Sequence, residues 1–177
     1  MSDRPSNIVN ADQLAWVDTA EANRAASPAD RDRGHHFGSR AKRLAASAGG
    51  ARLGCSLYEL PPGKRSFPFH YHVANEEAIY ILDGEVTLRL GDREIAVGPG
   101  DYIALPIGPD HPHQLINRSG SPVRYLCMST MQYPEIAFYP DSRKVGVIAP
   151  SGGVPGGPFR QLHRIGESLS YYDGEDG

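Results

Sequence analysis

The sequence predicts an all-β protein, a sandwich or a barrel, and two observations support this prediction. Short apolar segments with alternating side chains recur from about residue 37 to residue 150. The 20 glycines and 15 prolines of the chain fall largely between these segments, where turns are expected. Strands at this spacing are typical of sandwiches and barrels.

The composition fits a single soluble domain. A chain of 177 residues with 40% hydrophobic and 22% charged residues can bury a full hydrophobic core. The formal net charge of −3 and the lack of a Lys/Arg block argue against nucleic acid as a partner. No run approaches the ~18 apolar residues that span a bilayer, and the polar N-terminus lacks a signal-peptide pattern. We expect a cytoplasmic protein with no membrane partner.

Residues 1–36 are predicted to form an N-terminal arm. One short helix is expected within residues 11–26, and residues 27–36 are expected to form a loop. Trp16 is the single tryptophan and should pin the arm to the barrel. His35 and His36 are adjacent, so their side chains point in different directions, and we expect both at the surface.

The barrel domain is predicted over residues 37–150. Its first two strands are expected at residues 37–47 and 51–60, separated by the turn at Gly49–Gly50. Cys55 and Cys127 lie inside apolar strands without a CxxC spacing, so we expect reduced, buried thiols. Residues 66–72 should be extended, because the residue before a proline is biased away from helix.

A strand at residues 77–82 ends at Asp83-Gly84, which predicts a β-hairpin because a type I′ turn needs two positive φ angles. The following segment, residues 85–90, alternates cleanly, with Val86, Leu88 and Leu90 facing inward. The remaining strands are predicted at residues 93–97, 102–106, 113–117, 122–131, 134–140 and 144–150.

Residues 151–177 are predicted to form a C-terminal extension that packs across the barrel or onto a partner subunit. The segment is too apolar for a free tail, since it contains Phe159, Leu162, Ile165, Leu169, Tyr171 and Tyr172. An exposed sheet edge is a liability that such a segment can cover. We therefore expect a homodimer whose interface includes residues 1–40 or 151–177.

Two histidines and a glutamate in one short segment suggest a metal site. His70 and His72 are two residues apart, so in an extended strand both imidazoles face the same side. Glu77 follows and has the same parity as Ile79 and Ile81, which we place inside the barrel. Its neighbour in the sequence, Glu76, is then expected at the barrel mouth.

A fourth ligand is expected from a second histidine pair, His111 and His113. His113 opens an apolar strand, whereas His111 lies in a loop, and a strand holds a ligand more rigidly. We therefore predict that His70, His72, Glu77 and His113 bind one divalent metal ion such as Zn, Fe, Mn or Ni.

These segments resemble the two sequence motifs of the cupin superfamily. The first motif, G(x)5–6HxH(x)3–4E(x)6G, is matched by Gly63, His70, His72, Glu77 and Gly84. The second motif, G(x)5PxG(x)2H(x)3N, is matched by Gly100, Pro106, Gly108, His113 and Asn117, with four residues instead of two before the histidine. The H(x)3N spacing is retained at His113 and not at His111.

The resemblance implies a double-stranded β-helix, or jelly-roll barrel, with the metal inside its wider mouth. The chain also resembles, more loosely, small stand-alone bacterial cupins labelled as sugar-phosphate isomerases. Because one fold hosts many chemistries, function has to be argued from the site.

Three imidazoles and one carboxylate leave a divalent ion with net positive charge, as a Lewis acid requires. Glu77 is the natural base for removing a proton beside a polarised carbonyl. We expect an enzyme acting on a chelating, oxygen-rich, anionic metabolite, such as an isomerase of sugar phosphates. An Fe(II)-dependent dioxygenase, a lyase and a non-catalytic metal- or small-molecule-binding module remain alternatives.

Residues near the two motifs are candidates for contact with the substrate. Lys64 and Arg65, just before the first histidine pair, could hold an anionic group, and Gln114 could lie beside the ligands. Tyr80, like Tyr58 and Tyr125, could donate a hydrogen bond to the substrate, although aromatic residues in strands usually serve packing.

Overall fold

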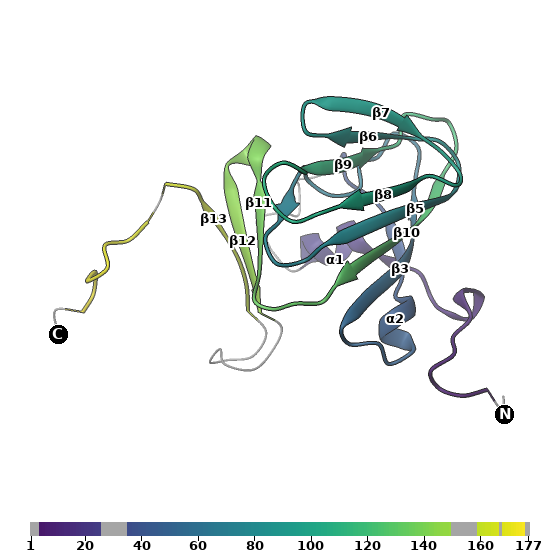
Figure 1. Cartoon of the computed structure of the whole chain (residues 1–177), viewed down its shortest axis with the longest axis horizontal. Coiled ribbons are helices and arrows are strands. Elements are labelled where there is room, and N and C mark those ends of the chain that lie inside the picture. The colour runs from purple at the N-terminus through teal and green to yellow at the C-terminus, as the bar shows by residue number, and fades with distance from the viewer. Residues whose placement is uncertain (1–3, 26–34, 150–158, 167, 176–177) are drawn as a thin grey trace.

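Three antiparallel β-sheets account for most of the structure (Figure 1). The computed structural model describes residues 4–25, 35–149, 159–166 and 168–175. Within these residues helices are few and short: η1 (Ala11–Gln13), α1 (Thr19–Ala25), α2 (Leu44–Ser47) and η3 (Pro140–Ser142). None of the helices found there has the length and apolar character needed to cross a membrane.

A six-stranded sheet forms one wall of the barrel. In spatial order it contains β1 (Val17–Asp18), β2 (Arg40–Lys42), β3 (Leu53–Leu60), β10 (Val123–Thr130), β5 (Glu77–Asp83) and β8 (Tyr102–Leu105). The central strand, β10, pairs with β3 on one side and β5 on the other. This pairing places Tyr58 opposite Tyr125 and Glu77 opposite Ser129.

Two smaller sheets face this wall. The three-stranded sheet contains β7 (Arg93–Val97), β6 (Val86–Leu90) and β9 (His113–Ile116). The four-stranded sheet contains β13 (Phe159–Arg164), β12 (Lys144–Ala149), β11 (Glu135–Tyr139) and β4 (Tyr71–His72). The two sheets are joined by an antiparallel bridge between His70 and His113, in which the backbone N–H of His113 donates to the carbonyl of His70 at 2.8 Å.

The core lies between the walls and is built from the inward-facing residues of alternating strands. Ile79 and Ile81 on β5, Leu88 on β6, Leu115 on β9 and Tyr125 on β10 are all buried in one cluster. The alternation read from the sequence of β5 and β6 is therefore confirmed, as is the all-β barrel class.

The first predicted strand, residues 37–47, is wrong after Lys42. Helix α2 follows β2, since the alanines of this segment favour helix over strand. Gly49 ends the helix in the left-handed region, at φ 82°, and the backbone N–H of Gly50 donates to the carbonyl of Ala45 at 2.7 Å.

The hairpin predicted at Asp83-Gly84 is also wrong, because β5 and β6 belong to different sheets. Gly84 does have a positive φ of 82°, but it serves a corner between the walls. A Cβ atom there would lie 2.9 Å from the carbonyl oxygen of Pro122, so only glycine permits this close approach. The turn at Gly91-Asp92, in contrast, does join β6 and β7 as a hairpin.

The N-terminal arm agrees with expectation where it is described. The predicted helix is present as α1. The side chains of Arg40 and Lys42 lie over the ring of Trp16, at 4.7 and 4.8 Å from its centroid, so Trp16 does hold the arm against β2. His35 and His36 are exposed, as predicted, and the rest of the predicted loop lies outside the described residues.

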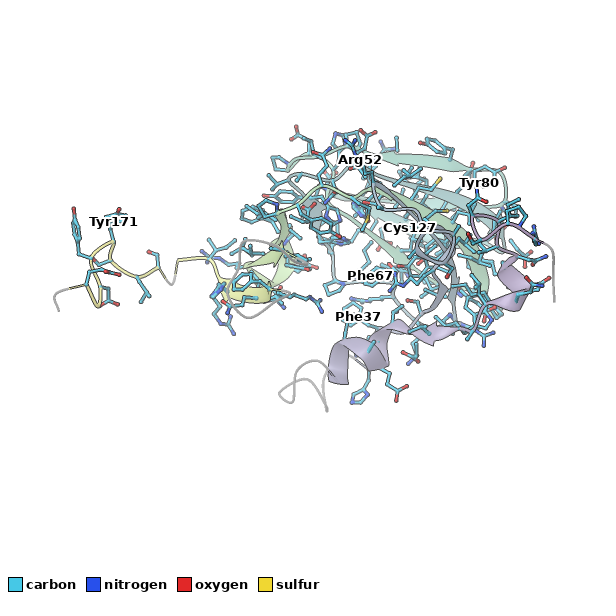
Figure 2. All side chains as sticks on the ribbon, turned by 90° about the horizontal axis from the view of Figure 1, so that it is seen from below. Phe37, Arg52, Phe67, Tyr80, Cys127 and Tyr171 are labelled. Carbon is cyan, nitrogen blue, oxygen red and sulfur yellow. The ribbon has the colours of Figure 1, made fainter. Side chains whose placement is uncertain are left out.

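The C-terminal extension packs on the barrel only in part. Strand β13 pairs with β12 along its whole length. Residues 168–175 lead away from the barrel (Figure 1), and Tyr171 lies far from it in Figure 2. Leu169, Tyr171 and Tyr172 are 82%, 88% and 69% exposed, so the predicted packing on the same barrel fails for this segment.

Asn117 fixes the chain after β9. Its side chain is fully buried, and its amide nitrogen donates to the carbonyls of Leu60 (2.9 Å) and Ser121 (2.8 Å). Its amide oxygen accepts from the backbone N–H of Ser119 at 2.9 Å. One side chain therefore satisfies three backbone groups at this corner.

Asn117→Ala should lower the free energy of unfolding by about 2–4 kcal/mol, because it leaves buried carbonyls without donors. Urea denaturation measures the loss. Asp92→Ala, in the exposed β6–β7 turn, is the control and should change stability by less than about 0.5 kcal/mol. Equal stability of Asn117→Ala and the wild type would contradict this role.

Candidate metal centre

The side chains of His70, His72, Glu77 and His113 meet where β5 and β9 begin. One ligand atom from each lies within 4.8 Å of the other three. The four come from different parts of the barrel: His72 lies on β4, Glu77 opens β5, and His113 opens β9. The cluster inferred from the sequence is thus brought together in space, and such a cluster could hold a metal ion.

Two of the histidines turn one ring nitrogen away from the cluster toward a backbone carbonyl. Nδ1 of His70 lies 2.8 Å from the carbonyl oxygen of Pro68, and Nδ1 of His113 lies 3.0 Å from that of His111. An acceptor at this position favours the tautomer with the hydrogen on Nδ1, so Nε2 keeps its lone pair for a ligand role.

His72 carries the strongest indication of a bound ion. Both of its ring nitrogens are buried without a hydrogen-bond partner among the described residues. Nε2 lies 3.4 Å from Oε2 of Glu77, and Nδ1 lies 3.5 Å from Oε1 of Glu135. A buried polar atom without a partner is costly, and a metal ion would use the lone pair of Nε2. The donor set, three imidazoles and a carboxylate, suits a divalent transition metal.

Glu77 is the negative charge of the cluster. Its Oε2 lies 3.2 Å from Nε2 of His113 and 3.4 Å from Nε2 of His72. Burial alone would raise the pKa of Glu77, but hydrogen bonds and charge from these two histidines hold the pKa well below its usual range. The carboxylate is therefore ionised at neutral pH.

The same surroundings separate the pKa values of two histidines. Burial lowers the pKa of His70 to about 3, and positive charge on His113 and His72 acts in the same direction. Burial also disfavours charge on His72, but the nearby carboxylates of Glu135 and Glu77 outweigh it and raise its pKa to about 9. In the metal-free protein a proton therefore resides on His72 in preference to His70.

Glu135 is a site residue that sequence reasoning missed. It opens β11, is 3% exposed, and accepts hydrogen bonds from the backbone N–H of Val73 (3.2 Å) and the side-chain amide of Asn75. The pairing of β11 with β4 places it behind His72. Val73 and Glu135 are 62 residues apart, so no local spacing marks this carboxylate. The one feature of the sequence that could have pointed to Glu135 is its position as an acidic residue at the start of an apolar strand.

Lys64 and Arg65, the predicted anion-binding residues, are not brought to the cluster. The ammonium of Lys64 donates to the carbonyl of His35 at 2.7 Å and lines a separate hollow beside the N-terminal arm. Arg65 is exposed, and its backbone N–H donates to the carbonyl of His36 at 2.8 Å. The segment before the first histidine pair therefore faces the arm.

Strand parity keeps two more predicted residues away. Tyr80 follows Ile79 and so lies on the opposite face of β5 from Glu77. Gln114 lies on the opposite face of β9 from His113, where its amide nitrogen donates to the carbonyl of Phe67 at 2.5 Å. Of the alternatives at the ligand positions, Glu76 is exposed, as expected, and His111 contributes its carbonyl to the ring of His113.

A cavity of about 290 Å³ lies next to the cluster, bounded by α2, β3 and β10. Glu77 lines it together with Cys55 and Cys127, which are free thiols, as predicted, but are only partly buried. Sγ of Cys127 lies 3.9 Å from Oε1 of Glu77, and burial raises the pKa of this thiol well above its usual value. Arg43, at the other side of the cavity, is exposed. The cavity therefore connects Glu77 with the surface.

Comparisons with known proteins agree with this fold. The family model described as Cupin domain matches residues 56–129. A solved structure of a sugar phosphate isomerase from a cupin superfamily, from Silicibacter pomeroyi, aligns with a TM-score of 0.72 over 94% of this chain and 98% of that chain. Its sequence identity is 24%, so the likeness concerns the fold.

Two curated relatives match shorter stretches. The uncharacterized protein MJ1618 of Methanocaldococcus jannaschii is 34% identical over 74 residues, which are 42% of this chain and 57% of that protein. Quercetin 2,3-dioxygenase of Bacillus subtilis is 35% identical over 57 residues, which are 32% of this chain and 17% of that enzyme. The chain thus spans less than two thirds of the length of either relative.

The metal-free protein should lose stability as the pH falls from 6.5 to 5. In this range His70 binds a proton only in the unfolded chain. Its pKa is about 3 in the folded protein, compared with the ordinary histidine value of 6.5 in the unfolded chain. His72 is protonated throughout this range in the folded protein, and in the unfolded chain it becomes protonated as the pH falls below 6.5, so its opposing contribution fades toward pH 5. Glu77 is ionised when folded and mostly ionised when unfolded. The free energy of unfolding should therefore fall by up to about 1.4 kcal/mol per pH unit, as measured by urea denaturation.

This pH dependence should largely disappear in His70→Asn. The control His163→Asn replaces an exposed histidine of β13 and should keep the wild-type slope. A slope that survives in His70→Asn would show that another group titrates.

Proposed function

Residues 56–129 match the family model described as Cupin domain, and on this premise we propose that the chain is a metal-dependent enzyme for a small, chelating, oxygen-rich anion. The carrying observation is the cluster of three imidazoles and one carboxylate within 4.8 Å, open to a cavity and including the unpartnered nitrogens of His72. We assign His70, His72, Glu77 and His113 as ligands of one divalent ion, such as Zn, Fe, Mn or Ni. Such an ion would act as a Lewis acid toward a bound carbonyl.

Glu77 is assigned to proton transfer. Its two oxygens have different surroundings, with Oε2 toward His72 and His113 and Oε1 toward Cys127. One oxygen can therefore remain with the imidazoles while the other accepts a proton. A carboxylate with so low a pKa is a weak base, so only a C–H bond beside a polarised carbonyl is acidic enough for it.

The favoured reaction is an aldose–ketose isomerisation. Glu77 would remove a proton from the carbon next to the carbonyl and return it to the neighbouring carbon, while the hydroxyl proton moves between the two oxygens. Sugar phosphates are the proposed substrate class, supported by the overall likeness to the Silicibacter pomeroyi sugar phosphate isomerase. A lyase would begin with the same proton abstraction.

A second candidate is an Fe(II)-dependent dioxygenase. It is favoured by the 35% identity to quercetin 2,3-dioxygenase over 57 residues and by a donor set that suits Fe(II). A non-catalytic binding module would use the same ligands without turnover.

We also propose a homodimer and a three-part chain. The parts are an N-terminal arm (1–36), the barrel (37–150) and a C-terminal extension (151–177). Support comes from the exposed Leu169, Tyr171 and Tyr172, which find no apolar contact on their own barrel and could bury against a partner.

His72→Ala should abolish tight metal binding, because it removes one ligand and leaves Glu77 with less compensating charge. Metal content of the purified protein and Co(II) titration measure this. Glu135→Gln should weaken affinity about 10- to 100-fold, since it loosens the support behind His72. His111→Ala is the control and should bind metal like the wild type. If His113→Ala kept its full metal content and His111→Ala lost it, His111 would be the fourth ligand in place of His113.

Metal-loaded protein should exchange the C2 proton of a hexose or pentose phosphate for deuterium in D2O, followed by NMR. Glu77→Gln should lower the rate at least about 100-fold, whereas Glu76→Gln, at the exposed neighbouring position, should not. Metal content is measured for each variant, so that loss of the ion is separated from loss of the base. Oxygen uptake with Fe(II) and a flavonol, without exchange, would favour the dioxygenase. Tight metal binding with neither activity would favour the binding module.

A further inference from the structure

We propose that Arg43 and Tyr58 form an anion-binding subsite in the cavity, so that the ligand carries a second anionic group, a phosphate or a carboxylate, apart from its chelating oxygens. This inference rests on the proposed function, because it concerns the same cavity. Lys64 and Arg65, the residues predicted from the sequence to bind an anion, contact the N-terminal arm instead. We assign this role to Arg43, beside α2, and Tyr58, on β3.

Arg43 is positioned toward the cavity by the junction of β2 and α2. It lines the same cavity as Glu77. Its Nη1 donates to Oη of Tyr58 at 3.2 Å, and its guanidinium carbon lies 6.0 Å from the centroid of the Tyr58 ring. The exposed side chain is therefore held toward Tyr58 at the edge of the cavity.

The charge of Arg43 has no carboxylate partner in the described part of the chain. Other arginines on these strands are paired: Arg40 and Arg124 both bind Glu59, at 2.6 and 3.0 Å. A guanidinium has five N–H donors, and the bond to Tyr58 uses one. The remaining planar fork matches the oxygens of a phosphate or carboxylate.

Tyr58 is a rigid partner in this subsite. Its side chain is 6% exposed, stacks on Tyr125 at 5.3 Å between ring centroids, and meets Phe67 edge to face at 5.9 Å. Burial raises the pKa of Tyr58 to about 12, so the phenol stays neutral. Its oxygen accepts from Arg43 and its own hydrogen remains free to donate to a ligand.

Nearby groups also indicate a polar ligand. Ser56, Ser129 and Thr130 line the cavity between Arg43 and Glu77. A ligand that ends in oxygens on both sides would satisfy these groups.

Charge balance leads to the same class of ligand. At the inner end the carboxylates of Glu77 and Glu135 together balance a divalent ion. The charge of Arg43 has no such partner among the described residues, so an anionic group of the ligand at this end would neutralise it.

The test uses Co(II)-loaded protein and three probes that share an α-hydroxycarboxylate head: lactate, malate and 3-phosphoglycerate. Lactate has no second anion, malate has a carboxylate, and 3-phosphoglycerate has a phosphate. Wild-type protein should bind malate or 3-phosphoglycerate about 10- to 100-fold tighter than lactate, the gain expected for a hydrogen bond to a charged group. The tighter of the two identifies the preferred anion.

Arg43→Met should abolish this preference while leaving lactate and Co(II) affinity unchanged. Arg52→Met is the matched control: it removes an equal charge from the exposed segment after α2, at a residue that does not line the cavity. Tyr58→Phe should reduce the preference with the fold intact, as checked by thermal unfolding.

Two results would overturn the subsite: a preference that persists in Arg43→Met, or an equal loss in Arg52→Met. Equal affinity of the wild type for all three probes, with Co(II) bound, would also overturn it and leave the metal site standing. Failure of the wild type to bind Co(II) would overturn the proposed function itself, and the subsite with it.

Discussion

A carboxylate buried at the mouth of a β-barrel needs compensating positive charge, and Glu77 is under this constraint. Its near neighbours are the imidazoles of His72 and His113, within 3.4 Å. Imidazole is neutral unless it binds a proton, so the compensation has to come from a proton on His72 or from a metal ion. The mouth of the barrel is therefore built around a position for a cation.

The same constraint links the cluster to the closure of the barrel. His70 and His113 pair through their backbones, and this bridge joins the three-stranded and four-stranded sheets. His72 is held from behind by Glu135, which reaches it only because β11 pairs with β4. Contacts that close the wall also orient the imidazoles, so the geometry of the cluster depends on closure of the barrel.

The parts of this structure that could be predicted from the sequence are those set by residues close together in the chain. Alternation with period two marks strands such as β5 and β6, and short spacings bring His70 and His72 to one face. Local signals failed where the neighbouring chain decides the outcome. Asp83-Gly84 has hairpin chemistry, but the corner it forms depends on the close approach of Pro122. The strand predicted over residues 37–47 overlooked a local signal, the helix preference of the alanines in α2.

Glu135 and Arg43 were missed because each reaches the site through contacts between separate segments: Glu135 binds Val73, 62 residues away, and Arg43 binds Tyr58, 15 residues away. Their positions also carry an argument about function. All four proposed metal ligands lie within residues 56–129, the segment that matches the cupin family, whereas Arg43 precedes it and Glu135 follows it. The shared domain thus supplies a donor set that suits several reactions. On the proposed assignment, the flanking segments add two functions. Glu135 orients His72, and Arg43 binds the second anionic group of the ligand. Substitutions at Arg43 could then alter the choice of anion without touching the imidazoles, which agrees with the rule that one fold hosts many reactions.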